Sequence, residues 1–193
     1  MARLIGITGG IGSGKSVVSR FLRCRGFEVY DCDSRAKALM EQSVRLKHLL
    51  RGRFGEECLL ADGKINRVYL ARRVFSEDTH RLWLNSQVHC MVREDIARIA
   101  DESAAGIWFV ESAILKSSGL DKMCDEIWLV DAPLEIRLRR VESRDGTDRE
   151  QVSLRMNAQQ HEFEALDATV HKIRNYGSDS LTFQIDKLLA RLA

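Results

Sequence analysis

One stretch near the start of the chain, Gly9–Ser16, constrains its fold more than any other feature. The letters GGIGSGKS fit the pattern G-x-x-x-x-G-K-[ST], between an apolar run over residues 4–7 and an amphipathic stretch that begins at Val17. Glycines allow backbone N–H groups to turn toward phosphate oxygens because no β-carbon blocks the approach. The helix expected after the loop points its positive amino end at the same anion. The stretch therefore predicts a site for a nucleoside triphosphate.

Each part of this segment, here called the P-loop, has an expected task. Lys15 reaches the β- and γ-phosphates of the nucleotide, and the Ser16 hydroxyl ligates Mg²⁺. The residues expected to contact the nucleotide are Gly9, Gly10, Ile11, Gly12, Ser13, Gly14, Lys15, Ser16 and Val17. A glycine-rich turn that binds nothing is the alternative, and the strand and helix expected on either side favour the phosphate site.

Composition and charge argue against several classes of protein. With 193 residues, the chain is long enough for one domain with an inserted subdomain. Its net charge of +2 argues against a general nucleic-acid binder. Five cysteines without a C-x-x-C pair indicate reduced thiols and a cytoplasmic protein. No apolar run approaches the ~20 residues of a membrane span, so we expect no membrane partner.

Five segments have the apolar character and β-propensity of buried strands, namely residues 3–8, 27–31, 107–111, 126–131 and 170–173. Helical patterns separate them, so the order predicts an α/β fold with a doubly wound, five-stranded parallel sheet. Ligands of such sheets bind beyond the carboxyl ends of the strands. The P-loop, Asp31, Asp33, Glu111 and Asp131 follow or end predicted strands, and we expect them to meet in one cleft.

The segment over residues 34–103 breaks the alternation of strands and helices. Its pattern is helical almost throughout, and the apolar spacing from Leu84 to Ile99 predicts one long helix. We therefore expect a helical insertion, within a single domain spanning residues 1–193, that carries the site of a phosphoryl acceptor.

Asp33 is the candidate general base. At the end of an extended strand, Asp31 and Asp33 point to the same side, where a carboxylate can orient an acceptor hydroxyl and accept its proton. The alternative is that both aspartates cap the helix expected from Ser34. Their position after the second strand of a P-loop protein favours the catalytic interpretation for Asp33.

Glu111 and Asp131 each end an apolar strand, as does the acid that supports Mg²⁺ in P-loop proteins. Only one such acid is needed, so either residue fits this role, and each one could instead mark the exit of its strand to solvent. Our prediction for the metal site is Ser16 with Glu111.

A concentration of basic residues follows the fourth strand: Arg137, Arg139, Arg140, Arg144, Arg149 and Arg155. On a helix that begins at Pro133, a favoured first-turn residue, three of them share a face. Guanidinium groups stabilise a phosphoryl group in transfer, so the concentration predicts a mobile lid over residues 140–160. The alternative is a solvated face in which arginines pair with Glu135 and Glu142. A capping box over Thr147–Glu150 predicts the start of a second helix.

Further motifs accompany the P-loop along nearly all of the chain. They are Thr8 before it, Asp31-Cys32-Asp33, Gly63-Lys64-Ile65-Asn66-Arg67, Val74-Phe75-Ser76, Leu84-Asn85 with His89, Arg140, Arg144-Asp145-Gly146, Arg155 with Gln159, and Asn175 with Gly177-Ser178. In this order they resemble the dephospho-CoA kinase family. The P-loop alone is shared by many families, whereas the asparagine–histidine segment and the arginine spacing are more specific.

The resemblance implies a fold of the P-loop kinase type and a definite reaction. The γ-phosphoryl group of ATP passes to the ribose 3′-hydroxyl of dephospho-CoA, giving CoA and ADP, the last step of coenzyme A biosynthesis. The resemblance further implies catalytic roles for Asp33 as base, for Lys15 and for Arg140, which contacts phosphates. It places Arg144 in the lid and Asn175 near the adenine.

The helical insertion corresponds, by the same resemblance, to the part of the family that binds the acceptor. Arg67 and His89 are then substrate-binding residues, although His89 also lies among apolar neighbours and packing is its alternative role. Three segments depart from the family pattern. Cys90 replaces a proline, Ser117 replaces a glutamate at the end of the segment from Ala113, and Thr169-Val170 replaces an Ala-Asp pair.

Two other functions fit part of the sequence. The P-loop also suits another small-metabolite kinase, such as a nucleoside or nucleoside-monophosphate kinase. A P-loop switch or motor that acts through a protein partner suits it less well, because the chain has no Asn-Lys-x-Asp segment for reading guanine and no ABC-type signature.

Overall fold

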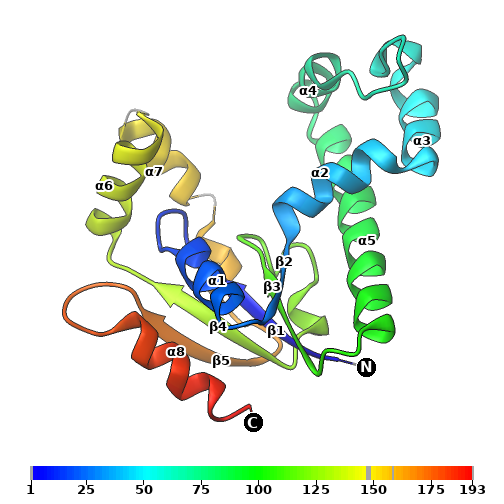
Figure 1. Ribbon diagram of the computed structural model, residues 1–193. Helices are drawn as coiled ribbons and strands as arrows, with labels where there is room; N and C mark the ends of the chain where they lie inside the picture. Colours follow the sequence, from blue (N-terminus) through cyan, green and yellow to red (C-terminus); the bar gives the residue numbers. More distant parts are fainter. Residues whose placement is uncertain (1, 147–148, 158, 193) are drawn as a thin grey trace. The chain divides into compact units, whose positions relative to one another are not determined.

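The computed structural model describes residues 2–146, 149–157 and 159–192. The chain divides into two compact units, whose elements are labelled in Figure 1. Met1–Asp31 and Ile99–Ala193 form the first, here called the sheet unit, and Cys32–Arg98 form the second, called the helical unit. The helical unit begins and ends slightly earlier than the range expected from the sequence. Among the residues described, no helix is both long and apolar enough to span a membrane.

The sheet unit is built on parallel strands, which are β1 (Arg3–Thr8), β2 (Glu28–Asp31), β3 (Ile107–Glu111), β4 (Glu126–Asp131) and β5 (Thr169–Arg174). Their order is β2-β3-β1-β4-β5, which confirms the expected five-stranded α/β architecture. The central strand β1 is buried from Leu4 to Thr8, as expected where strands flank both edges and other elements cover the faces. The register sets Ile7 beside Glu111 and Thr8 beside Leu129. The P-loop therefore leaves the sheet between β3 and β4.

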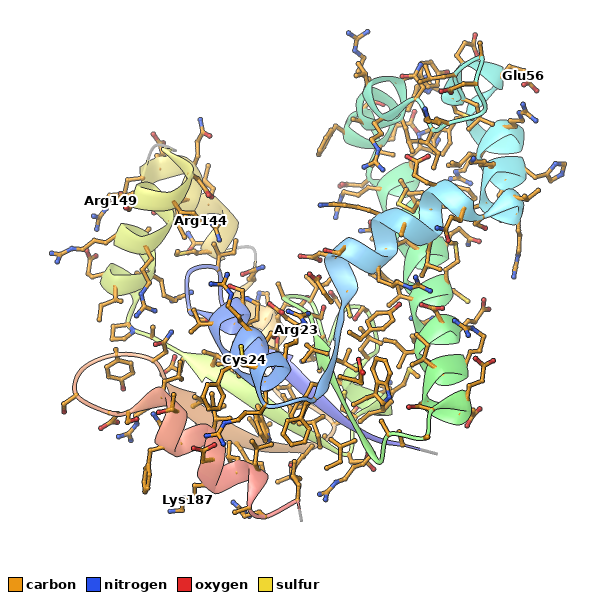
Figure 2. The ribbon with its side chains drawn as sticks, in the orientation of Figure 1. Arg23, Cys24, Glu56, Arg144, Arg149 and Lys187 are labelled. Carbon is orange, nitrogen blue, oxygen red and sulfur yellow. The ribbon has the colours of Figure 1, made fainter. Side chains whose placement is uncertain are left out.

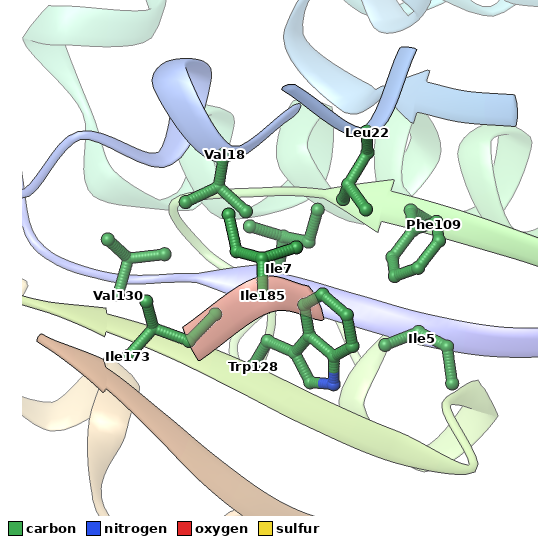
Figure 3. Packing of buried hydrophobic residues seen from close by; sticks show 9 residues of the cluster. All are labelled: Ile5, Ile7, Val18, Leu22, Phe109, Trp128, Val130, Ile173 and Ile185. Atoms are coloured by element: carbon green, nitrogen blue, oxygen red, sulfur yellow. The ribbon is translucent and has the colours of Figure 1, made fainter. Parts of the chain in front are cut away.

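Helices α1 (Lys15–Cys24) and α8 (Leu181–Leu189) pack on one face of this sheet. Figure 3 shows Val18 and Leu22 of α1 and Ile185 of α8 against side chains of four strands. Those strand residues are Ile5, Ile7, Phe109, Trp128, Val130 and Ile173. Burial of each large apolar side chain stabilises the fold by about 1.5–3 kcal/mol. The cluster therefore fixes the strands from which the P-loop and the candidate acids project.

Gly6 alternates with Ile5 and Ile7 and so faces the other side of the sheet. A β-carbon at this position would lie 3.1 Å from both Cys124 Sγ and Leu115 Cδ2. These residues belong to the segment between β3 and β4, which includes the 3₁₀ helix η2 (Asp121–Met123). Burial raises the pKa of the Cys124 thiol to about 12, and the nearby carboxylates of Asp121 and Asp125 add to the effect.

Helices α6 (Leu134–Asp145) and α7 (Arg149–Asn157) occupy the expected lid segment, with the 3₁₀ helix η3 (Gln160–Phe163) after them. Their shared apolar cluster consists of Leu138, Val141, Val152 and Met156, and Ile11 of the P-loop packs against it. Pro133 is the N-cap of α6, so the prediction of a first-turn proline is wrong by one residue. The expected capping box includes residues 147 and 148, which lie outside the described residues.

The helical unit consists of α2 (Cys32–Gln42), α3 (Val44–Phe54), the 3₁₀ helix η1 (Glu56–Cys58), α4 (Arg67–Ser76) and most of α5 (Asp78–Glu102). α3 ends at Phe54 because Gly55 adopts a φ of 87°, which confirms the break expected there. Its own apolar core contains Leu46, Leu50, Phe54, Cys58, Ile65 and Leu70. This separate core gives the unit internal cohesion independent of the sheet.

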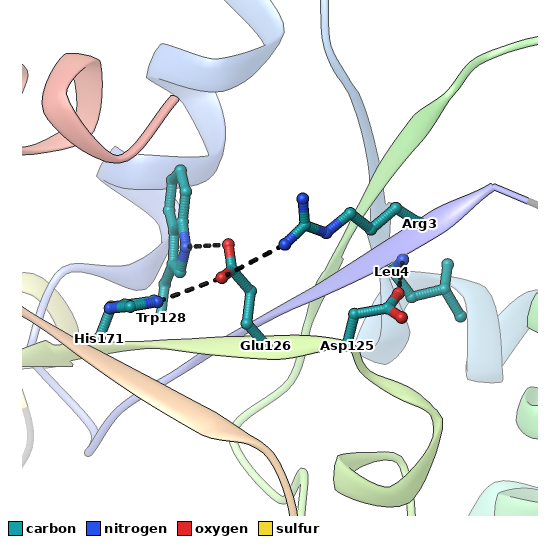
Figure 4. A network of polar contacts seen from close by, with 6 residues as sticks. All are labelled: Arg3, Leu4, Asp125, Glu126, Trp128 and His171. Atoms are coloured by element: carbon teal, nitrogen blue, oxygen red, sulfur yellow. Dashed lines mark hydrogen bonds and ion pairs between the residues drawn. The ribbon is translucent and has the colours of Figure 1, made fainter. Parts of the chain in front are cut away.

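A polar network joins three strands at the amino end of β4 (Figure 4). The buried carboxylate of Glu126 accepts hydrogen bonds from His171 Nε2 at 3.1 Å and Trp128 Nε1 at 3.4 Å, and lies 3.7 Å from Arg3 Nη2. The neighbouring Asp125 accepts a hydrogen bond from the Leu4 N–H at 2.7 Å. These contacts link β1, β4 and β5 at the edge opposite to the P-loop.

Candidate active site

The P-loop connects β1 to α1 through three glycines with positive φ: Gly9 at 151°, Gly12 at 78° and Gly14 at 100°. Residues with a β-carbon rarely adopt this conformation. Space also requires glycine, because a β-carbon at Gly9 would lie 2.3 Å from Val130 O. Glycine therefore allows the loop to turn while it packs closely against β4.

Several features of the P-loop fit a phosphate group. α1 begins at Lys15, and the N–H groups of a first helical turn point out of the amino end, where an anion can bind. The first turn carries no acidic residue, and Ser16 is exposed there. Thr8 Oγ1 and Ser13 Oγ are buried without a hydrogen-bond partner among the described residues. Lys15 Nζ donates to Gly9 O at 2.6 Å, so the ammonium group already lies against the loop.

Side chains from α6 and from the segments after α7 and β5 hold the P-loop backbone. Arg140 Nη1 donates to Gly12 O and Ser13 O, each at 3.3 Å. Asn175 Nδ2 donates to Ser13 O at 2.7 Å. Gln159 Oε1 accepts the Ile11 N–H at 3.1 Å. The sequence motifs contained these three side chains, but the residue pattern alone did not indicate that they touch the loop.

The candidate acids lie at the same edge of the sheet as the P-loop. The register places Glu111 beside both Ile7 of β1 and Asp31 of β2. Asp131 ends β4, where its Oδ2 accepts a hydrogen bond from Lys172 Nζ at 2.9 Å. The structure thus brings the P-loop, Asp31, Glu111 and Asp131 to one sheet edge, where Asp131 forms an ion pair with Lys172.

A magnesium site made of Ser16 and one acid agrees with the donor set. Among the residues that the structure describes, no group of three His, Cys, Asp or Glu side chains is arranged to hold a metal. Mg²⁺ commonly keeps several water molecules and uses one or two carboxylates together with substrate phosphates. A hydroxyl and a single carboxylate therefore suit this ion when a nucleotide is bound.

The conformation expected at Asp33 is wrong. β2 ends at Asp31 and α2 begins at Cys32, so Asp33 is an exposed residue in the first turn of a helix. The two-residue alternation that placed Asp31 and Asp33 on one side of a strand does not apply. An acid in the first turn is favourable for a helix, which fits the capping alternative as well as a catalytic role.

The arginines of the expected lid have different surroundings. Arg144 Nε and Nη2 donate to Asp145 at 2.7 and 2.9 Å, and this hydrogen bonding raises the pKa of Arg144. Arg149 Nη2 lies 2.7 Å from Glu135 Oε2, and the pKa of Arg149 is raised by that hydrogen bond. Figure 2 labels both arginines on their helices. The pairing with Glu135 is the one expected for a solvated face, and the Arg155 side chain lies outside the description.

The expected acceptor residues Arg67 and His89 both belong to the helical unit. Arg67 begins α4, and its Nη2 donates to Glu41 Oε1 at 2.8 Å. It borders a pocket of about 220 Å³ that is otherwise lined by Met40, Ile65, Leu70, Ala71, Val74 and Leu84. His89 is half-buried on α5 and is not among the residues that line this pocket.

Two contacts near the site had no signal in the sequence. The Ser117 N–H donates to Glu162 Oε2 at 3.1 Å, which places the Glu162 carboxylate against the Ser117 backbone. Arg137 covers Gly10, where a β-carbon would lie 2.2 Å from its Nη1. Local patterns do not reveal such contacts, because the first joins residues 45 positions apart.

Comparisons with known proteins identify the family of this chain. A family model described as dephospho-CoA kinase matches residues 3–180. A dephospho-CoA kinase from Porphyromonas gingivalis is 43% identical over 158 residues, covering 82% of this chain and 78% of the relative. One from Bacteroides fragilis is 37% identical over 193 residues, covering 100% and 94%. The crystal structure of TT1252 from Thermus thermophilus has a TM-score of 0.81 at 36% identity, covering 100% and 98%. The match includes the P-loop and its supporting residues, and the chain belongs to the dephospho-CoA kinase family.

Proposed function

We propose that this protein transfers the γ-phosphoryl group of ATP to the ribose 3′-hydroxyl of dephospho-CoA, giving CoA and ADP. Members of its family phosphorylate dephospho-CoA to CoA in the last step of coenzyme A biosynthesis. The observation that carries the proposal is the P-loop at the carboxyl edge of the sheet, with Glu111 beside the strand that leads into it. We place the reaction in the cytoplasm, where the five cysteines remain free thiols, as they are in the structure.

The donor half of the reaction depends on the P-loop. The N–H groups of Gly14, Lys15 and Ser16 donate hydrogen bonds to phosphate oxygens, and the Lys15 ammonium stabilises the charge that develops on the transferring group. Mg²⁺, when bound, neutralises charge on the β- and γ-phosphates, and Ser16 with Glu111 would hold it. Arg144 of the lid adds a further cation and helps to exclude water.

The acceptor half depends on Asp33, which follows β2 by two residues along the chain. Its carboxylate accepts the proton of the 3′-hydroxyl while the hydroxyl oxygen bonds to the γ-phosphorus. The bond from that phosphorus to the oxygen bridging to the β-phosphate breaks, and ADP leaves with the electron pair. Mass and charge balance, because the proton moves to Asp33 and later to solvent.

The helical unit is the part we assign to the rest of dephospho-CoA. Its pocket is apolar except for Arg67, which suits an acceptor that carries both an aliphatic arm and phosphates. Arg67 and His89 are the residues proposed to contact this substrate.

The test measures ATP-dependent conversion of dephospho-CoA by the intact protein and by Asp33→Asn. Loss of the base lowers kcat by about 10²- to 10⁴-fold. Asp78→Asn is the matched control, because Asp78 is also an exposed acid in the first turn of a helix. If Asp33 only stabilises α2, both variants lose a similar amount of stability and neither loses kcat, and the proposed role is then contradicted. Absence of CoA formation by the intact protein contradicts the function itself.

A further inference from the structure

Arg140 and Asn175 both donate hydrogen bonds to backbone carbonyls of the P-loop, at Gly12 and Ser13. Arg140 Nη1 donates to Gly12 O and to Ser13 O, each at 3.3 Å, and its Nη2 donates to Asn175 O at 2.8 Å. Asn175 Nδ2 donates to the same Ser13 O at 2.7 Å. The Asn175 N–H is itself fixed on Asp131 O at 2.8 Å. The carbonyl of Ser13 therefore accepts hydrogen bonds from both residues, and Asn175 links it to β4.

The direction of a carbonyl group determines the direction of the neighbouring N–H. In a trans peptide, the C=O and the N–H point to opposite sides. Donors on Ser13 O therefore turn the Gly14 N–H away from Arg140 and Asn175. This N–H comes directly before those of Lys15 and Ser16, which begin α1 and point toward its amino end. The hydrogen bonds to Ser13 O thus align the Gly14 N–H with the anion-binding end of α1.

Packing around Gly14 holds the Asn175 amide in place. A β-carbon at Gly14 would lie 2.1 Å from Asn175 Nδ2, so the amide occupies the space that a side chain would need. Both Asn175 and Arg140 are half-buried. Arg140 additionally brings a positive charge to the loop, and hydrogen bonds from a charged donor are stronger than neutral ones. The contacts therefore set the loop conformation before a nucleotide is bound.

We propose that Arg140 and Asn175 are positioning residues, which set the P-loop N–H groups for the β-phosphate and do not touch the transferred γ-phosphoryl group. This inference rests on the proposed binding of ATP at the P-loop. Under this proposal both residues orient the P-loop backbone. The family resemblance implied instead that Arg140 contacts phosphates and that Asn175 lies near the adenine.

Binding of different nucleotides separates positioning from direct contact. ADP and a non-hydrolysable ATP analogue both carry a β-phosphate, AMP carries none, and only the analogue carries a γ-phosphate. Titration calorimetry gives the Kd of each for the intact protein, Arg140→Lys, Asn175→Ala, Asn175→Asp and the double variant Arg140→Lys/Asn175→Ala. Arg20→Lys is the control, because Arg20 is an exposed arginine on α1 outside the P-loop. Melting curves without nucleotide test whether each variant is folded. If Asn175→Ala is unfolded, the nucleotide affinities of Asn175→Asp and Arg140→Lys are compared instead.

The expected result is a loss of affinity of about 10- to 100-fold that is equal for ADP and the ATP analogue, with AMP and the Arg20→Lys control unaffected. Because both residues share Ser13 O, the double variant should lose less than the product of the single losses. A loss confined to the ATP analogue would mean a γ-phosphate contact and would overturn the inference. Unchanged ADP binding or independent losses would overturn it too. If the intact protein binds no ADP, the proposed function itself is contradicted. This outcome is therefore distinct from the outcomes that overturn only the positioning role of Arg140 and Asn175.

Discussion

Lys172 Nζ lies 2.9 Å from Asp131 Oδ2, which joins the end of β4 to the edge strand β5. The ion pair directs the Asp131 carboxylate toward β5, whereas Glu111 ends the strand on the other side of β1. The two acids are equivalent in the sequence, and this lysine distinguishes them. This difference favours our prediction that Glu111 is the acid of the magnesium site.

Replacement of Glu111 by glutamine should raise the Mg²⁺ concentration that gives half-maximal turnover by about 10- to 100-fold. The reason is that the amide keeps the size of the side chain and removes its charge. Steady-state rates at saturating ATP and a range of Mg²⁺ concentrations provide the measurement. Asp131→Asn should leave the half-saturating concentration unchanged, and the opposite pattern would assign the metal to Asp131.

Replacement of Lys15 by alanine should lower kcat by about 10²- to 10³-fold, because a preorganised charge on the transferring phosphoryl group is lost. Lys15 Nζ already lies 2.6 Å from Gly9 O, so little rearrangement is needed for it to act. Lys187→Ala, an exposed position on α8, is the control (Figure 2). Turnover of Lys15→Ala equal to that of the control would show that the donor site has been wrongly assigned.

The ion pair between Arg67 and Glu41 should make the helical unit sensitive to acid. Hydrogen bonds from Arg67 lower the pKa of Glu41 below its ordinary value of 4.5. The carboxylate therefore contributes stability above pH 4.5, and this contribution is lost as the pH falls through the lowered pKa. Since the pair is partly exposed, the contribution is at most about 1 kcal/mol.

Urea unfolding of the intact protein and of Glu41→Gln above and below this range measures that contribution. The variant should lose less of its free energy of unfolding on acidification than the intact protein does. Glu56→Gln is the control, because Glu56 pairs with Arg51 at 3.1 Å but its side chain is 81% exposed. An identical acid response of the intact protein and Glu41→Gln would refute the prediction.

Cys124 should resist alkylation in the folded protein. Its thiol has a pKa of about 12 as a result of burial, so it stays protonated and weakly nucleophilic near neutral pH. Cys24 is exposed on α1 and should react first with iodoacetamide (Figure 2). Peptide mass mapping over a time course gives the order of modification, with Cys24→Ser to confirm the assignment. Modification of Cys124 as fast as Cys24 in the folded state would contradict this account of its burial.

The fold could be predicted because its signals are local. Each strand is an apolar run of a few residues, and the P-loop identifies which strand comes before the first helix. The error at Asp33 has a local cause as well. Whether Cys32 continues a strand or begins a helix depends on backbone angles at one or two residues, and both outcomes fit the letters Asp31-Cys32-Asp33.

The hydrogen bonds from Arg140 and Asn175 to the P-loop could not be predicted from local sequence patterns. The bond from Arg140 to Gly12 joins residues 128 positions apart, and the bond from Asn175 to Ser13 joins residues 162 positions apart. No periodicity or motif spacing specifies such pairs, because they follow from strand order and helix placement. The sequence named Arg140 and Asn175 through a family motif, and the structure shows that their contacts are with the loop backbone.

The most direct test of the central claim is a competition among acceptors. The intact protein is incubated with ATP, Mg²⁺ and equal amounts of dephospho-CoA, adenosine and AMP, and the products are identified by mass spectrometry and ³¹P NMR. The account predicts that CoA with a new phosphate on its ribose 3′-oxygen forms in preference to every other product, together with an equal amount of ADP. Preferential phosphorylation of adenosine or AMP, or release of free phosphate alone, would contradict it.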